Sequence, residues 1–590
     1  MDVTVYFCEN IFENILKEFF MRVVLSSIAL VLHFSLNAQP PAKPDYPKGY
    51  FRNPLTVAMD LSGNFGELRP NHYHMGIDLK TLKRENLQVH AAAEGYIAKV
   101  KIEPGGFGRA IYINHPNGYT TLYAHLNNFA PALEAYIKRE QYRLEEWPIF
   151  IDIPPDLFPV KKGEFIAFSG NTGGSQAPHL HFEIRRTADD VNLNPLLFEL
   201  PLQDNTSPRI IRLAIFDRTK STYEQSARFI PVKAAGVARY IATLPVITVS
   251  TPAISLGITA YDTHTGSSNL NGIFESTLLM DQEPIISFRM DGISYNDTRY
   301  MNAHIDYKTK TLGGSYIQHL SDLPGYINSI YTRIKGDGVL DISDGEIRAI
   351  TIEVKDAYGN TSAASGKVQY RQPSTAHGRQ STEKVFYPLM LDGFETQDCE
   401  FFIGERCLYD SAHIRYSKNN SANPQVVSAV HSIGSGMIPL QERFLIRIRP
   451  NQSLSEEQKQ RTVMQWFSGA RKDVVKAEWQ NDWASAKFRD FGFYQLLVDE
   501  VPPVIVPIGF TDGSNLSKAT RIAFTITDNL SKFKNVRAEL DGKWLRFTND
   551  KGRTFIYYFD EKCLSGQHEL KISAEDEAGN KTERGFRFIR

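Results

Sequence analysis

At 590 residues the chain is too long for a single hydrophobic core, and it should divide into about three to five domains. Hydrophobic residues make up 42% and charged residues 23%, which is ordinary for soluble globular protein, and 66 basic against 67 acidic residues give a net charge of -1. This balance argues against a nucleic-acid-binding protein, which normally needs a basic face, so we expect no nucleic-acid partner.

The N-terminus has the layout of a secretory signal peptide. From Met21 a basic residue is followed by an apolar stretch and then by small residues, with a cleavage site after Ala38. The stretch is short for a membrane span, which needs about 20 apolar residues. The residues before Met21 are either an unused upstream start or a genuine extension that forms an uncleaved anchor. We expect 1–38 to be an N-terminal extension and signal peptide. The mature protein is expected to be exported to the periplasm, the cell surface or the extracellular space, without a stable membrane span.

The next segments differ in composition. A Pro-rich linker at 39–50 leads into 51–200, where short β-branched runs are broken by glycine. Within it, Asn-Gly at 117–118 lies between two strand-like runs and predicts a hairpin. An interruption at about 130–159 begins with helical spacing and ends with prolines that forbid helix. We expect this interruption to be an insertion in an otherwise all-β domain.

The rest of the chain contains an internal repeat, or echo, in which two segments resemble two later ones. TSPRIIRL (206–213) resembles VPPVIVPI (501–508), and ITIEVKDAYGNTS (350–362) resembles LKISAEDEAGNKT (570–582). A Gly-Asn turn between alternating strands is typical of the last hairpin of a β-sandwich, and the opening prolines suit an edge strand.

Two immunoglobulin-like β-sandwiches, 205–372 and 500–590, follow from this echo. Between them, 380–498 is expected to be a β-rich domain of uncertain type. It contains one segment with helical patterning, SLSEEQKQRTVMQWFSGA, whose start Ser453 or Ser455 could cap. These modules are either spacers or stability modules, or they offer a surface to a protein partner.

The four cysteines are too few for a disulfide scaffold. Cys399 and Cys407 are close enough in sequence to pair across a hairpin or loop, and whether they do depends on an oxidising compartment. Cys8 and Cys563 have no obvious partners. None of the four belongs to a CxxC arrangement, so we assign no cysteine metal site.

Histidines are concentrated in two short stretches, NHYHMGIDL and PHLHFEI. His179 and His181 are two apart in a strand-like run, so both project from one face. His74 and Asp78 are four apart and also share a face if the segment is extended. A set of two histidines and one aspartate suits zinc and leaves a fourth position open for water, whose pKa falls to about 7 on the metal. Taken singly, each pattern is also compatible with histidines that are buried and satisfied by the backbone.

Several neighbouring residues have a simpler interpretation. His72 is also evenly spaced from His74 and is a weaker ligand candidate. His90 and His115 lie in strand-like sequence and are expected to be structural. Arg69 and Asn71 precede the first stretch and are candidates for lining a groove, and the glycines of SGNTGGS are expected to form a turn before the HLH strand.

Four motifs resemble the lysostaphin/LytM-type zinc metallopeptidases of bacterial cell walls: HMGIDL (74–79), YAHL (123–126), VKKGEFIAFSGNTG (160–173) and PHLHFEI (178–184). The resemblance covers about 51–200 and implies a compact antiparallel β-fold with a groove over the sheet. The whole chain is therefore expected to be mainly β. A LytM-type antiparallel β peptidase domain with a helical insertion is followed by Ig-like β-sandwich domains.

Position by position, the resemblance implies that His74 and Asp78, in H-x-G-x-D, and His181, the second histidine of HLH, bind one Zn²⁺ per chain. His179 and His125 would flank the water, one orienting or deprotonating it and the other stabilising the oxyanion. The sequence leaves the division of these two tasks open. The implied function is an exported zinc metalloendopeptidase that hydrolyses peptide cross-links of peptidoglycan.

Two alternatives stay open. The chain could be a non-catalytic protein that binds cell wall or activates another peptidoglycan hydrolase, although all five expected residues are present. It could also act mainly through its sandwiches, in adhesion or protein contact. One departure from the family concerns the link between YAHL and VKKG, which is usually short. The longer link here lies beside His125 in sequence and is expected to form a wall or a cover of the cleft.

Overall fold

The computed structural model describes residues 45–590 except for three short stretches, 328–329, 373–383 and 531–532. The predicted signal peptide and the first half of the Pro-rich linker, 39–44, lie outside the described residues. The chain divides into two units, Met1–Pro47 and Lys48–Arg590, and every helix and strand described belongs to the second. Among the described residues, no helix has the length and apolar character needed to cross a membrane.

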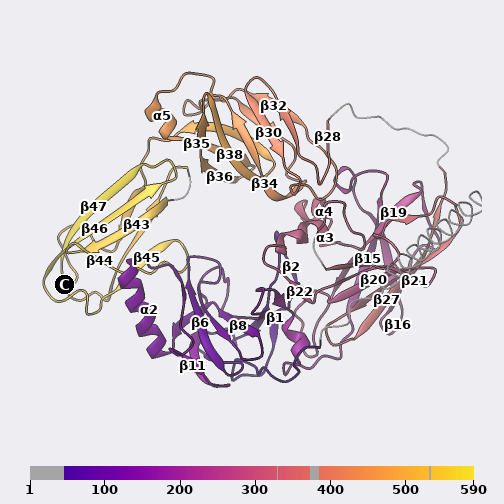
Figure 1. Ribbon diagram of the computed structural model, residues 1–590, viewed down its shortest axis with the longest axis horizontal. Coiled ribbons are helices and arrows are strands. Elements are labelled where there is room, and N and C mark those ends of the chain that lie inside the picture. The colour runs from indigo at the N-terminus through magenta and orange to yellow at the C-terminus, as the bar shows by residue number, and fades with distance from the viewer. Residues whose placement is uncertain (1–44, 328–329, 373–383, 531–532) are drawn as a thin grey trace, which may run out of the picture. The chain divides into compact units, whose positions relative to one another are not determined.

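The first part of the second unit, drawn in indigo and violet in Figure 1, is built on an antiparallel sheet in the order β1-β4-β13-β8-β7-β6-β10. Its strands are β1 (Leu61–Gly63), β4 (Ile77–Lys80), β6 (Gly95–Ile102), β7 (Arg109–Asn114), β8 (Tyr119–Ala124), β10 (Ile149–Asp152) and β13 (His179–Arg186). The hairpin predicted at 117–118 is confirmed, because it joins β7 to β8.

Smaller elements complete this part of the chain. A three-stranded sheet contains β5 (Gln88–His90), β12 (Phe165–Ser169) and β9 (Leu126–Phe129), and β2 (Leu68–Arg69) pairs with β3 (His72–Tyr73). At the margins of the main sheet, β11 (Pro159–Val160) pairs with β6, and β14 (Asn192–Leu193) pairs with β13. The 3₁₀ helix η1 (Pro195–Phe198) follows β14.

The predicted change of character after residue 130 is confirmed. Helix α2 (Pro131–Leu144) has proline at its first turn, where no intrahelical donor is lost, and ends at Glu145 in a left-handed conformation. The Pro-rich sequence after it forms no helix. Its apolar residues instead form β10, which pairs with β6 and so extends the main sheet.

The next part, up to Tyr370, forms a sheet in the order β23-β19-β15-β16-β17-β27-β26-β20-β21-β24. The strands are β15 (Arg209–Asp217), β16 (Arg228–Gly236), β17 (Arg239–Ala242), β18 (Ile247–Val249), β19 (Ala253–Tyr261), β20 (Glu275–Met280), β21 (Glu283–Arg289), β22 (Gly292–Ile293), β23 (Gln318–His319), β24 (Tyr331–Arg333), β25 (Leu340–Asp341), β26 (Arg348–Lys355) and β27 (Thr361–Tyr370). The short helices are η2 (Thr222–Glu224), η3 (Thr298–Tyr300), α3 (Met301–His304) and α4 (Tyr307–Thr311).

The opening prolines of the two similar segments predict that each segment begins with an edge strand. This prediction is wrong for β15. This strand lies between β19 and β16, and the proline is tolerated because Pro208 precedes the first paired residue, Arg209. The core of this part also contains Phe65, Tyr73 and Met75, and β22 pairs with β14. The peptidase-like sequence and the segment after it therefore share one hydrophobic core.

Residues 385–498 form two five-stranded sheets around a common core. One sheet contains β29 (Asp392–Glu395), β30 (Cys399–Ile403), β34 (Pro439–Ile448), β37 (Glu478–Gln480) and β38 (Trp483–Asp490). The other contains β32 (Tyr416–Asn419), β33 (Val430–Ile433), β35 (Thr462–Ser468), β36 (Arg471–Lys476) and β39 (Gly492–Val498). Strands β28 (Val385–Phe386) and β31 (Ala412–His413) form a separate pair. Cys399 and Cys407 are both buried free thiols, so the disulfide considered for them is not formed in this structure.

The helix predicted within this part is wrong in its second half. Ser455 caps α5 (Glu456–Gln460) through a capping box, as one of the two predicted serines, but the helix ends there. The following TVMQWFS forms β35, which pairs with β36 on one side and β39 on the other. Its β-branched and aromatic residues gain more from this buried sheet than from a helix.

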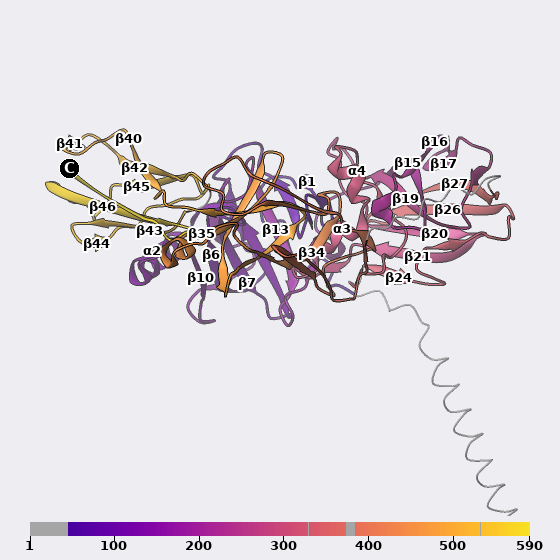
Figure 2. The ribbon, with the colours of Figure 1, turned by 90° about the horizontal axis from the view of Figure 1, so that it is seen from above.

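The last residues, coloured yellow, form a sandwich whose core contains residues of both sheets (Figure 2). One sheet contains β40 (Val504–Ile508), β42 (Arg521–Thr527) and β45 (Thr554–Tyr558), and the other β41 (Ser514–Asn515), β43 (Phe533–Leu540), β44 (Lys543–Trp544), β46 (Gln567–Asp576) and β47 (Lys581–Ile589). As predicted from the echo, Gly-Asn turns close the β26–β27 and β46–β47 hairpins, and both glycines have positive φ.

Candidate metal centre

Strand register brings the two histidine-rich stretches together. On β13, His181 is directly opposite Asp78 of β4, and directly opposed residues project to the same face. His74 lies just before β4, and the chain between the two predicted ligands approaches β13 closely at Gly76. A Cβ on Gly76 would lie 2.5 Å from the carbonyl oxygen of Phe182, so only glycine fits there.

Three ligand-type atoms converge at this point. His74 Nε2 lies 3.0 Å from His181 Nδ1 and 3.1 Å from Asp78 Oδ1, and His181 Nδ1 lies 2.9 Å from the same Asp78 oxygen. All three side chains are buried. Tetrahedral zinc, with bonds of about 2.0–2.1 Å, separates its ligand atoms by about 3.3 Å, so the triangle is close to the size that zinc requires.

The hydrogen bonds behind the triangle determine which atoms hold lone pairs. His74 Nδ1 lies 2.8 Å from the carbonyl oxygen of Asn64, so it donates and its Nε2 is unprotonated in the neutral ring. His181 Nε2 lies 2.9 Å from Glu183 Oε1 and donates to that carboxylate, which leaves Nδ1 as an acceptor. Two nitrogen lone pairs and a carboxylate oxygen thus face one another, and this arrangement is stable only with a cation among them. The donor set fits a divalent metal ion.

Without a metal, a proton can occupy this position. Burial lowers the pKa of His74 to about 4. Burial would lower the pKa of His181 as well, but its hydrogen bonds to Asp78 and Glu183 outweigh that effect and raise it to about 9. The two imidazoles of the triangle are therefore driven in opposite directions, and His181 is the one that holds the proton.

Arg69 contacts the site more directly than the sequence suggested. Its Nη2 lies 2.6 Å from Asp78 Oδ2, the carboxylate oxygen that does not face the histidines. Burial alone would raise the pKa of Asp78, but His74 and the hydrogen bonds from the site histidines outweigh it and hold the pKa well below its usual value. Asp78 is therefore ionised and oriented from both sides.

Glu183 is a site residue that the sequence analysis missed. Its Oε1 accepts from His181 Nε2 and, at 2.6 Å, from the hydroxyl of Tyr295, while its Oε2 accepts from Arg185 and Asn192. Burial would raise the pKa of Glu183, but Arg185 and His181 outweigh it and lower it to about 2. The even spacing from His181 on a strand was a usable signal for Glu183. Nothing in the sequence pointed to Tyr295, which follows β22 in another part of the chain.

The two remaining predicted histidines lie beside the triangle. His125 Nδ1 lies 2.9 Å from the carbonyl oxygen of Thr172, and His179 Nδ1 lies 2.8 Å from that of Ala177. Their ring centroids are 4.8 Å apart, and His179 Nε2 lies 3.4 Å from Asp78 Oδ1. Burial, and then the nearby His181 and His179, lower the pKa of His125 to about 3. The structure thus brings all five predicted residues together.

The three histidines with a simpler interpretation, His72, His90 and His115, lie outside the cluster of five predicted site residues and bond to other groups. His72 is exposed and outside the cluster, with its Nδ1 2.8 Å from the carbonyl oxygen of Pro70. His90 binds the carbonyl oxygen of Gly163, and His115 binds Glu94 O and Thr121 Oγ1.

The glycine-rich sequence before β13 forms the expected turn. Gly170 makes a bridge with His179. Gly173 has a φ of 67°, and a Cβ there would lie 2.2 Å from the backbone nitrogen of Gly108. The turn therefore packs backbone against backbone and places the start of β13, with His179, beside His125.

Comparison with known proteins identifies the class of the part of the chain that contains this site as a peptidase domain. Residues 72–142 and 158–195 match Peptidase family M23, so the chain contains an M23 peptidase domain, and residues 386–499 match the Zu5-like domain. The unmatched stretch 143–157 falls within the segment expected to be an insertion. The Zu5-like match covers the β-rich part for which the sequence analysis offered no type.

Two curated relatives match the peptidase part. An "Uncharacterized metalloprotease" of Haemophilus influenzae is 34% identical over 163 residues, 26% of this chain and 28% of the relative. The "DD-carboxypeptidase/endopeptidase Mpg" of Neisseria meningitidis serogroup B is 34% identical over 164 residues, 27% of this chain and 31% of the relative. The chain therefore spans less than a third of the length of the curated relatives it matches.

Two solved structures cover the same part. The catalytic domain of the prophage-encoded M23 protein EnpA from Enterococcus faecalis is 19% identical, with coverage of 25% of this chain and 96% of that chain and a TM-score of 0.19. The catalytic domain of lysostaphin from Staphylococcus simulans is 23% identical, with coverage of 23% and 88% and a TM-score of 0.16.

Proposed function

We propose that this chain is an exported zinc metalloendopeptidase that hydrolyses peptide cross-links of peptidoglycan. The observation that supports it most is the buried triangle of His74 Nε2, Asp78 Oδ1 and His181 Nδ1, with sides of 2.9–3.1 Å. The M23 match gives the class of chemistry. The relatives named DD-carboxypeptidase/endopeptidase favour a peptide substrate that contains D-amino acids. Export rests on the signal-peptide pattern that ends at Ala38.

In this proposal His74, Asp78 and His181 hold one zinc ion. A zinc ion supplies Lewis-acid chemistry, which acidifies water and polarises a peptide carbonyl. Asn64 and Glu183 fix the tautomers of the two histidines, so that each presents a lone pair at the required atom. Such supporting hydrogen bonds orient ligands and maintain metal affinity. Arg69 holds the carboxylate of Asp78 from the opposite side.

In the proposed reaction, His125 and His179 accept and donate protons. Each has its Nδ1 bonded to a backbone carbonyl, so each presents Nε2 as the atom available for proton transfer. A neutral imidazole can accept the proton of the attacking water, and once protonated it can donate to the developing oxyanion or the leaving amine. With their rings 4.8 Å apart, the two can share these tasks over one scissile bond.

The test is a digest of purified peptidoglycan with mass analysis of the released fragments. Wild type and His72→Ala should release the same peptides, because His72 is an exposed neighbour outside the cluster. His181→Ala should lose both zinc and turnover. His125→Ala should keep its zinc while turnover falls by about 10²–10⁴-fold, the usual contribution of a general acid or base.

Two outcomes would contradict the proposal. Equal release by wild type and His181→Ala would rule out the site. A zinc-loaded wild type that sediments with peptidoglycan but releases nothing would favour the alternative of a non-catalytic cell-wall-binding protein or an activator of another hydrolase.

A further inference from the structure

A second cluster of acidic side chains lies away from the candidate zinc site. Asp204 belongs to the linker before β15, Asp262 follows β19, and Asp356 follows β26. One carboxylate oxygen from each lies within 4.8 Å of the other two. All three side chains are buried, with exposed fractions of 8%, 6% and 3%. Buried carboxylates at this spacing repel one another strongly unless a positive charge accompanies them.

No lysine or arginine of the described residues supplies such a charge, and the nearby His264 is already paired with Asp60. Across the residues that the structure describes, none of these three carboxylates forms an ion pair with lysine or arginine, whereas Asp262 Oδ1 is fully buried without a hydrogen-bond partner. A fully buried oxygen without a partner, on a carboxylate that lies beside two others, indicates a missing ligand.

The other two carboxylates are oriented by backbone donors. Asp204 Oδ1 accepts from the backbone nitrogens of Thr206 and Thr265. Asp356 accepts from the backbone nitrogens of Tyr358 and Asn360 and from the Asn360 side chain. These bonds fix each carboxylate and favour its ionised form.

A fourth side-chain oxygen lies on the same face of the strands as Asp262. Asn271 is directly opposite Asp262 in an antiparallel bridge, so both side chains project to one face. Asn271 is 3% exposed, and its Oδ1 is also buried without a partner. Two unpartnered side-chain oxygens thus accompany two oriented carboxylates.

We propose that Asp204, Asp262 and Asp356, with the Asn271 amide oxygen, bind one calcium ion. The ligands are all oxygen, which selects a hard cation rather than zinc. Calcium takes 6–8 oxygens at about 2.3–2.6 Å, so opposite ligands lie up to about 5 Å apart, and the spacing in the cluster fits. Magnesium would require closer, strictly octahedral ligands.

The calcium site would join two segments that connect to the peptidase part, residues 51–200. Asp204 belongs to the connection from the peptidase part. The loop after Asp262 reaches back to that part, because His264 Nε2 lies 3.0 Å from Asp60 Oδ1 and Gly272 exchanges two hydrogen bonds with the side chain of Asn64. The carbonyl of Asn64 in turn binds His74. Calcium would thus stabilise the junction on which a predicted zinc ligand rests.

The last sandwich provides an internal comparison. Asp499, Asp528 and Asp576 form the equivalent cluster of the sequence echo, and Asn580 binds Asp576 and the carbonyl of Asp499 as Asn360 binds Asp356 and the carbonyl of Asp204. Here, however, Asp528 is only partly buried.

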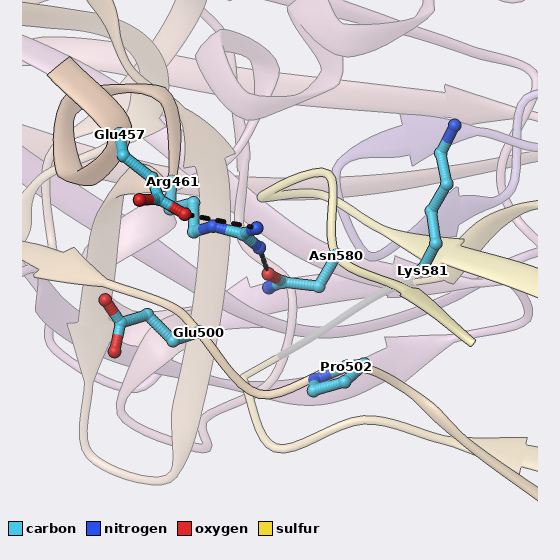
Figure 3. A pocket seen from close by; sticks show the side chains of 6 residues that line it. All are labelled: Glu457, Arg461, Glu500, Pro502, Asn580 and Lys581. Carbon is cyan, nitrogen blue, oxygen red and sulfur yellow. Dashed lines mark hydrogen bonds and ion pairs between the residues drawn. The ribbon is translucent and has the colours of Figure 1, made fainter.

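Figure 3 shows the Arg461 guanidinium directed at Asn580 and Glu457, and no ion pair among the described residues joins it to the three aspartates. In addition, Asn529 donates to Asp499 Oδ1. The second cluster therefore differs from the first in the exposure of Asp528 and in the Asn529 donor, and it makes a matched control for the first.

The experiment is a calorimetric titration of CaCl₂ into the full chain, stripped of calcium and loaded with zinc. Wild type should bind one calcium ion, and its thermal midpoint should rise with calcium. Asp262→Asn should bind at least about 100-fold more weakly, because the charge of the ligand set determines calcium affinity. The control Asp528→Asn should bind this calcium as wild type does.

Two results would overturn the proposal. One is the absence of calcium heat and of any calcium-dependent shift in wild type, which needs no folded variant to interpret. The other is equal calcium binding by wild type and Asp262→Asn. If a proton occupies the cluster in place of calcium, wild type will show no response to calcium, and Asp262→Asn will be as stable as wild type or more stable.

Discussion

Glu183 accepts hydrogen bonds on both carboxylate oxygens, and one of its donors belongs to a different part of the chain. His181 and Tyr295 share Oε1, and Arg185 and Asn192 share Oε2. A carboxylate behind a ligand histidine fixes its tautomer and raises its basicity. Tyr295 therefore belongs to the support of the candidate metal site, although it follows β22, whereas the rest of the support lies in the peptidase part.

The Tyr295→Phe variant tests this support. Removing the hydroxyl keeps the ring but leaves Glu183 Oε1 with one donor, so zinc affinity should fall by about 10-fold, the lower end of the effect of such partners. Competition with a chromophoric chelator measures it. Tyr240→Phe, on β17, makes no contact with Glu183 and should match wild type. Unchanged affinity in Tyr295→Phe would show that the hydroxyl has no such role.

The sequence was most informative where the chemistry needs a fixed residue type at a short spacing. His74, Asp78, His125, His179 and His181 were all selected from motifs, and the structure places them together. Arg69, Glu183 and Tyr295 contribute through distance and orientation alone, and arginine, glutamate and tyrosine are common at positions with no such role. Only the fold brings Tyr295, 112 positions away in sequence, to Glu183.

At the scale of elements, α2 has contacts that its position beside His125 did not suggest. Lys138 forms ion pairs with Asp560 and Glu561, and Glu145 with Arg537. The ring of Tyr142 packs edge-on against Trp544. Helix α2 therefore contacts the last sandwich through its exposed side, while Leu133 and Ile137 are buried. A role as a wall or cover of the cleft stays a prediction.

Gln141 is the residue of α2 whose removal should matter most. It is fully buried, its amide donates to the carbonyl of Trp147, and its Oε1 accepts from Arg546 Nε at 2.5 Å. Gln141→Leu should lower the free energy of unfolding by about 1–3 kcal/mol, because it leaves a buried donor and acceptor unpaired. Urea unfolding measures the change. The exposed Glu146→Gln is the control, and equal stability of all three proteins would show that this contact contributes nothing.

Element types were predictable where local pattern and tertiary contacts agree. Helix α2 has good helix formers and a proline at its start, and both Gly-Asn hairpins have their turn glycines at positive φ. The pattern failed for β35, because its residues suit either a helix or a buried strand and only the pairing with β36 and β39 decides. It also failed for β15, which is an inner strand because β19 pairs with its other side from beyond β16, β17 and β18 in sequence.

At the scale of the whole described unit, the core is continuous between the peptidase part and the segment after it. Phe65, Tyr73 and Met75 belong to the same cluster as the strands of 209–370, and β14 pairs with β22. A boundary placed near residue 200 therefore separates connected structure. We expect the peptidase part to depend on its neighbour for stability, in addition to the contact from Tyr295.

The shared core contains buried histidines that should make the protein sensitive to acid. Burial lowers the pKa of His304, and that of His319, to about 3. In the unfolded chain a histidine titrates near 6.5, so the stability is fully present above about pH 6.5 and is lost as the pH falls toward 3. Each histidine should cost about 1.4 kcal/mol per pH unit in that window.

Comparison with His304→Gln isolates this effect from the other titrating groups. The free energy of unfolding, measured in urea between pH 6.5 and pH 4, should fall less steeply for the variant, by about 1.4 kcal/mol per pH unit. Identical slopes for the two proteins would contradict the assignment of His304 as a buried neutral residue.

The proposed activity depends on one metal ion held by His74, Asp78 and His181. The most direct measurement is the zinc content of the purified full chain after dialysis against metal-free buffer, by mass spectrometry of the elements. Wild type and His125→Ala should retain about one zinc per chain, while His74→Ala and Asp78→Ala should retain almost none. A folded wild type without tightly bound transition metal, or equal zinc in wild type and Asp78→Ala, would contradict it.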